Sequence, residues 1–131
     1  MKRKEHGARV WYVPDGYMPH TPPALQESGL ISHEAICIVN PTKQRARVTM
    51  TVYFEDRDPL RDIHFTVGAE RSLHVRLDKP EMLGGKVIPF GIPYSLKVES
   101  DVPIIAQHSR LDITQPNLAL FTTIPYYVED D

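Results

Sequence analysis

The sequence predicts an all-β protein, an antiparallel β-sandwich of about seven to eight strands. Apolar residues recur with period two in several short segments, and no window shows the i, i+3, i+4, i+7 apolar spacing of an amphipathic helix. In addition, 12 prolines and 7 glycines divide the 131-residue chain into short stretches. Many short strands in a chain of this size are typical of a sandwich or a barrel.

The alternating segments are expected to form half-buried strands. They comprise residues 46–54, 63–67, 73–77 and 94–98, and a further apolar segment, residues 118–124, completes the pattern. Residues 35–39 and 102–106 are apolar on both faces, which predicts central strands or strands whose outer face another subunit covers. Pro103 cannot donate a ladder hydrogen bond, so a strand is expected to begin there. Two long connections, residues 14–29 and 78–93, are expected to be packed or functional.

The composition predicts one domain over residues 1–131, with a core at about 8–127 and flexible, solvated tails at both ends. Fifteen Lys and Arg against 17 Asp and Glu give a net charge of −2, which disfavours a nucleic-acid-binding protein. The single cysteine, Cys37, lies in an apolar run and predicts a buried, inert thiol in a reducing compartment. The sequence contains neither the apolar stretch of a signal peptide nor that of a membrane span, so we expect a cytoplasmic protein.

The motifs of common enzymes are missing from the sequence. Its 6 histidines lack the spacing of metal ligands, and Cys37 has no second cysteine with which to bind zinc. Ser32–His33 and His108–Ser109 are neighbours along predicted strands, so their side chains point to opposite faces and cannot form a nucleophile–base pair. We therefore expect no enzymatic activity, no metal and no cofactor.

Polar side chains follow several of the predicted strands. By period two, His108, Arg110 and Asp112 share one face, with Gln107 on the other, while His74 and Arg76 also share a face. Such groups suit hydroxyl or anion binding, but solvated sheet faces and cross-strand salt bridges use the same residues. A similar choice applies to aromatic residues near the start: Trp11 is either a core anchor or, with Tyr12 and Tyr17, a stacking surface for a sugar ring.

Two polar–apolar strings carry a family resemblance. They are Ile31-Ser32-His33-Glu34 and Gln107-His108 followed by Arg110-Leu111-Asp112, and the likeness continues in register from about Trp11 to Tyr126. On these residues the chain resembles the Anabaena sensory rhodopsin transducer family. The resemblance implies a β-sandwich without enzymatic activity that assembles as a homo-oligomer, a tetramer, and binds sugars or related metabolites. It places the ligand at Ser32, His33, Glu34, Asn40, Arg71, His74, Arg76, Gln107, His108, Arg110 and Asp112.

The leading functional hypothesis is a non-enzymatic module that senses a carbohydrate or sugar acid. The alternative is a soluble transducer that docks on a membrane photoreceptor or another receptor, as the resemblance implies from the founding member of that family. A distant third is weak DNA binding, in which an oligomer would gather the basic residues Lys2–Lys4 on one face.

Overall fold

The computed structural model describes residues 5–115 and 117–129, which form eight strands and two short 3-10 helices. The helices are η1 (Pro23–Ser28) and η2 (Pro80–Met82). The strands are β1 (Ala8–Gly16), β2 (His33–Asn40), β3 (Ala46–Phe54), β4 (Leu60–Val67), β5 (Arg71–Arg76), β6 (Tyr94–Asp112), β7 (Ala119–Thr123) and β8 (Tyr126–Val128). Every strand pairing among the described residues is antiparallel, and the predicted fold class is confirmed.

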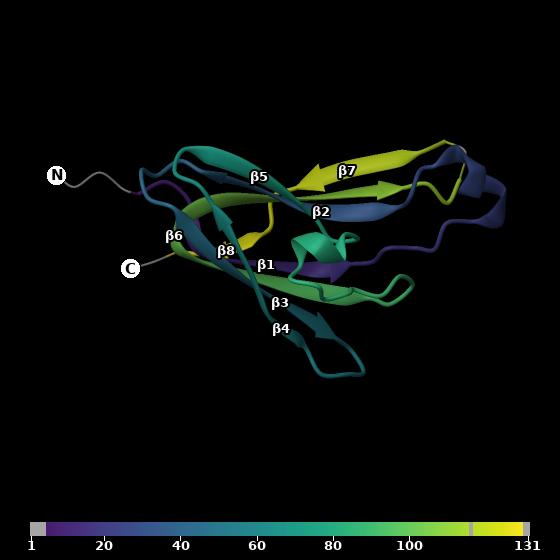
Figure 1. Ribbon diagram of the computed structural model, residues 1–131, viewed down its shortest axis with the longest axis horizontal. Coiled ribbons are helices and arrows are strands. Elements are labelled where there is room, and N and C mark those ends of the chain that lie inside the picture. The colour runs from purple at the N-terminus through teal and green to yellow at the C-terminus, as the bar shows by residue number, and fades with distance from the viewer. Residues whose placement is uncertain (1–4, 116, 130–131) are drawn as a thin grey trace.

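The long strand β6 belongs to both layers of the sandwich (Figure 1). Its first half pairs with β1 and β3, which gives one layer the order β4-β3-β6-β1-β8. Its second half pairs with β2 and β7, and β5 pairs with the far side of β2. Residues 35–39 in β2 are therefore flanked by β5 and β6, whereas in residues 102–106 of β6 Ile104 pairs with β1 and Ile105 and Ala106 pair with β2.

The prediction that a strand begins at Pro103 is wrong, because β6 runs through this residue without a break. Along β1, Ala8 lies opposite Ile104 and Val10 lies opposite Glu99, so the ladder shifts register between these pairs. Pro103 falls inside this irregular stretch and has no residue opposite it. Its missing N–H therefore costs no ladder hydrogen bond, and the irregularity lets β6 pass from one layer to the other.

The core lies between the two layers and takes the inward residues of the alternating strands. Val48, Met50 and Val52 of β3 meet Ile36 and other apolar residues of both layers in one buried cluster. Burial of this kind is the main favourable term in folding.

Trp11 is a core anchor, with only 3% of its surface exposed and its indole N–H donating to the Ala8 carbonyl at 3.0 Å. The two long connections are packed, as predicted: Met18 from one and Leu83 and Ile88 from the other are buried in the core cluster. The Gly91 N–H donates to the Met18 carbonyl at 2.8 Å and ties the two connections together.

Lys2–Lys4 and two residues of the acidic end, Asp130 and Asp131, lie outside the described residues. Within the described part of the chain, the structure has no helix of the length and apolar character that crossing a bilayer requires.

Candidate functional site

The buried carboxylate of Glu34 is the centre of a polar cluster at one end of the sandwich. Its side chain is 0% exposed. Oε1 accepts hydrogen bonds from the Tyr94 hydroxyl and from His108 Nε2, both at 2.7 Å. Oε2 accepts from the Tyr17 backbone N–H at 2.7 Å and from Arg110 Nε at 2.8 Å. A carboxylate offers about four acceptor positions, so this one is fully used.

Strand register brings the cluster together. Glu34 of β2 lies opposite Arg110 of β6, and Ile36 lies opposite His108. Because side chains alternate along a strand, Glu34, His108 and Arg110 all face the space between the layers. Tyr94 comes from the other end of β6, which belongs to the opposite layer, so the cluster joins the two layers through hydrogen bonds.

The cluster holds Glu34 in its charged form. Burial raises the pKa of Glu34, but hydrogen bonds from His108, the Tyr17 N–H and Tyr94, with the Arg110 charge, outweigh burial and bring the pKa below its ordinary value of 4.5. Burial, and then the charge and hydrogen bond of Glu34, raise the pKa of Tyr94 far above its ordinary value. Tyr94 therefore remains a donor at every physiological pH.

Phe121 of β7 covers the cluster on the side of β6. The His108 ring meets the Phe121 ring edge-on, with centroids 6.1 Å apart, and the Arg110 guanidinium lies 5.2 Å from the Phe121 centroid. Arg110 Nη2 also donates to the Asp15 carbonyl at 3.2 Å and lies 3.6 Å from the Asp15 carboxylate. These contacts hold the Arg110 side chain in place, with 20% of it exposed.

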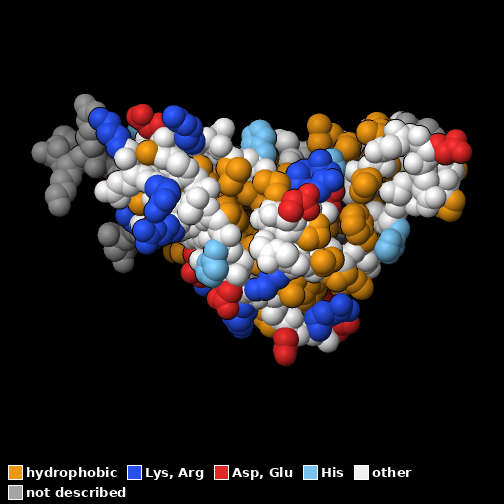
Figure 2. All heavy atoms as spheres, viewed as in Figure 1, with side chains coloured by type: hydrophobic (Ala, Val, Ile, Leu, Met, Phe, Trp, Pro, Cys, Tyr) orange, Lys and Arg blue, Asp and Glu red, His pale blue; other side chains and the backbone are white. Residues whose placement is uncertain are grey.

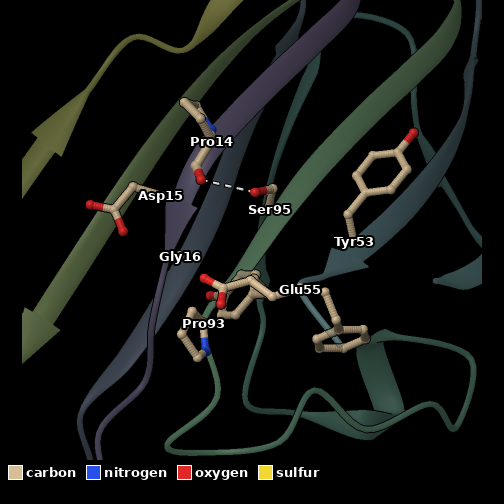
Figure 3. A pocket seen from close by; sticks show the side chains of 9 residues that line it. Pro14, Asp15, Gly16, Tyr53, Glu55, Pro93 and Ser95 are labelled. Atoms are coloured by element: carbon tan, nitrogen blue, oxygen red, sulfur yellow. Dashed lines mark hydrogen bonds between the residues drawn. The ribbon is translucent and has the colours of Figure 1, made fainter. Parts of the chain in front are cut away.

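A cavity opens on each side of the cluster, and the end of β1 lines both. The first, of about 220 Å³, is lined by Tyr94 and Tyr53 among others, and Figure 3 shows the Ser95 hydroxyl donating to the Pro14 carbonyl at its wall. The second, of about 350 Å³, is lined by His108 and by residues of β7 and the turn that follows it. Asp15 lines both cavities.

Of the predicted site residues, Glu34, His108 and Arg110 are brought together in the cluster. Ser32 lies beyond them, buried, with its hydroxyl accepting from the Ile113 N–H at 2.9 Å. Asp112 accepts from the backbone N–H and the hydroxyl of Thr114. Ser32 thus joins the segment before β2 to the end of β6, and Asp112 makes a local contact at that end.

Asn40 lies at the far end of β2 and makes a separate set of hydrogen bonds. Its side-chain amide donates to the carbonyls of Gln44, Val67 and Gly68 at 2.8 to 3.1 Å, and its oxygen accepts from Thr42. The side chain is fully buried and fastens the β2–β3 connection to the end of β4. Asn40 is therefore separate from the Glu34 cluster.

Three other predicted residues lie in β5 or at the start of β2. Arg76 forms a two-bond pair with Asp78, both at 2.7 Å, and His33 Nδ1 lies 2.9 Å from the Ile31 carbonyl. Arg71 is exposed and donates to the Glu70 carbonyl. None of these three contacts the Glu34 carboxylate in the described structure.

The remaining two, His74 and Gln107, face outward and line a groove of about 310 Å³ on the outer face of β5, β2 and β6. Cys37 lines the same groove and is only partly buried, so the expectation of a buried thiol is wrong. The reason is alternation along β2: Ile36 and Ile38 fill the core, which turns Cys37 outward.

Sequence reasoning missed Tyr94, Asp15 and Phe121. Tyr94 carries a usable signal, because a tyrosine at an inward strand position needs a buried partner for its hydroxyl. Asp15 and Phe121 carry none, since their places depend on how β1 and β7 pair. In the described residues, no group of three or more His, Cys, Asp or Glu is placed to hold a metal ion.

Comparisons with known proteins agree on one family. The family model of the Anabaena sensory rhodopsin transducer matches residues 6–127. The crystal structure of Thermotoga maritima 1070 is 40% identical with a TM-score of 0.82, and the match covers 97% of this chain and 100% of that one. The structure of the Anabaena sensory rhodopsin transducer is 35% identical with a TM-score of 0.70, covering 81% of this chain and 90% of that one. No curated protein matches. This chain belongs to the Anabaena sensory rhodopsin transducer family.

Proposed function

We propose that this protein is a non-enzymatic signal transducer that docks on a membrane receptor through an apolar surface at its C-terminal strands. Membership of the transducer family supports a signalling role. The observation on which the docking proposal rests is the composition and exposure of β7, β8 and the residues beside them.

We call the exposed apolar side chains of β7, β8 and the residues beside them the C-terminal apolar surface. Leu120 is 70% exposed, Tyr126 68% and Ile124 58%. The full set is Leu118, Leu120, Phe121, Ile124, Tyr126, Tyr127 and Val128, which lie on both faces of this edge because neighbours along a strand alternate. In Figure 2, hydrophobic side chains reach the surface along the upper edge, where Figure 1 places β7. An exposed apolar patch of this kind is typical of an interaction site.

The surface also lacks the usual protection of sheet edges. Among the described residues, β7 pairs only with β6 and β8 only with β1, so each is an edge strand there. Edge strands of monomeric proteins commonly carry charged residues or prolines that prevent pairing with other chains. Residues 117–124 include no charged residue and no proline. A partner that covers this edge buries its exposed apolar side chains.

Carbohydrate sensing, the leading hypothesis from the sequence, gains no support from the geometry. Sugar recognition needs several donors and acceptors that converge on an open pocket. Here the Glu34 acceptor positions are taken by Tyr17, Tyr94, His108 and Arg110. Among the described residues, every buried side-chain nitrogen or oxygen has a hydrogen-bond partner. The cluster therefore fits a structural tie between layers better than a vacant polyol site.

The homo-oligomer expected from the resemblance also belongs to this proposal. Its interface would be the outer groove, where Val39 is 42% exposed on the central strand β2. Assembly there would cover the outer face of residues 35–39 and leave the C-terminal apolar surface free for the receptor.

Affinity capture from native membranes tests the docking proposal. The wild-type protein should enrich an integral membrane protein, and Leu120→Asp should reduce the capture at least tenfold. Val87→Asp is the matched control, because Val87 is 59% exposed but lies in the connection between β5 and β6. Equal capture by Leu120→Asp and Val87→Asp, or enrichment of no membrane protein, would contradict the proposal.

A further inference from the structure

The cavity of about 350 Å³ beneath the C-terminal apolar surface has the features of a small-molecule site. We propose that it binds a neutral aromatic molecule with one ring N–H or O–H group, which donates a hydrogen bond to Nδ1 of His108. This inference concerns a ligand of the protein alone, so it goes beyond the proposed docking function and does not depend on it.

The walls of the cavity are mainly apolar. Val13 and Pro14 come from β1, and Phe121, Ile124, Pro125 and Tyr126 come from β7, the following turn and β8. The volume lies at the low end of the range for small-molecule pockets, which are typically apolar with a few oriented polar groups. A flat ring of one or two cycles fits a space of this size and character.

His108 supplies the oriented polar group. Its Nε2 lies 2.7 Å from a carboxylate oxygen of Glu34, and an ionised carboxylate only accepts hydrogen bonds. The hydrogen of the neutral ring is therefore on Nε2, which leaves Nδ1 as an acceptor.

Nδ1 is also accessible. It makes no hydrogen bond within the described residues. Every side-chain nitrogen there that is fully shielded from solvent has a hydrogen-bond partner, so Nδ1 is not fully shielded. His108 is only 2% exposed but lines the cavity, so we place Nδ1 at the inner wall, where it can meet a molecule inside.

The surroundings select a neutral ligand with few polar groups. An anion would meet the Asp15 carboxylate in the cavity wall and the charged Glu34 behind His108. A cation would lose its hydration in a mainly apolar cavity, which is costly for a charged group. A sugar would lose most of its hydrogen bonds to water, because each polar group buried without a partner is costly. An aromatic ring with a single donor avoids all three penalties.

Two probes of equal shape test the acceptor. Indole carries a ring N–H, and indene has a CH₂ group in its place. Titration followed by NMR should show indole binding with about tenfold higher affinity than indene, the size of one net hydrogen bond. Adding indole should also shift the Nδ1 ¹⁵N resonance of His108. Equal affinities, or an unchanged Nδ1 resonance on saturation, would overturn the role of His108.

Two variants on β7 test the location. Thr123 lines the cavity, whereas its neighbour Thr122 does not. Thr123→Phe should fill the space and abolish indole binding, and Thr122→Phe should leave it unchanged. Failure of the wild type to bind indole at millimolar concentration, or equal binding by both variants, would refute the site. Neither result bears on receptor capture, which Leu120→Asp tests separately.

Discussion

Replacing Glu34 with leucine should destabilise the fold strongly, because the change removes the acceptor for a set of buried donors. The side chain is 0% exposed and accepts from Tyr94, His108, Tyr17 N–H and Arg110 at 2.7 to 2.8 Å. Leucine has a similar volume, so little cavity is created and the loss is mainly polar. Removing one partner of a buried ion pair costs about 3–5 kcal/mol, which sets the expected decrease in the free energy of unfolding.

A graded series sharpens this prediction. Glu34→Gln should lose less than Glu34→Leu, because the amide oxygen can still accept from the Tyr17 N–H and Arg110. Glu99→Gln is the control: Glu99 pairs with Lys97 at the surface, where its side chain is 45% exposed. An exposed pair of this kind contributes at most about 1 kcal/mol.

Equilibrium unfolding in urea measures all three variants. The slope of the unfolding free energy against urea should stay unchanged, so that shifts in midpoint report stability alone. A loss of less than about 1 kcal/mol for Glu34→Leu, well under the 3–5 kcal/mol expected for a buried pair, would show that the cluster does not tie the layers together.

Three further predictions concern acid stability, a buried amide and the oligomer. The pKa of Glu34 is lowered in the folded state, so the stability that its charge contributes is present above the unfolded pKa of 4.5 and is lost as the pH falls through the folded pKa. In thermal melts from pH 7 to pH 2, the melting temperature of Glu34→Leu should therefore fall less steeply with acid than that of the wild type. Asn40→Ala should cost about 2–3 kcal/mol in urea unfolding, because three carbonyls and Thr42 lose their partner; a cost equal to that of the exposed Asn117→Ala would refute this. Val39→Glu in the outer groove should convert the proposed oligomer to monomers in light scattering, and a mass equal to that of the wild type would exclude this face as the interface.

The strands with clear alternation were predictable from local sequence. Segments within β3, β4 and β5 follow the apolar period of two, and the turn residues between them mark the ends. β7 lies within a further apolar segment, residues 118–124, that does not alternate. β1 was not predicted as a strand, because Pro14, Asp15 and Gly16 are turn residues within its bounds. Its pairing with β6 and β8 outweighs these local preferences.

For the site, the sequence alone determined that His108 and Arg110 share a face, because alternation is a property of a single strand. Only the tertiary structure decided that this face is the inner one and that Glu34, 74 positions from His108 and 76 from Arg110, lies opposite. It likewise separated His74 and Gln107, which face outward, from the cluster within. The physical reason is that strand register depends on contacts between segments far apart in the chain, and a shift of one residue would turn every side chain to the other face.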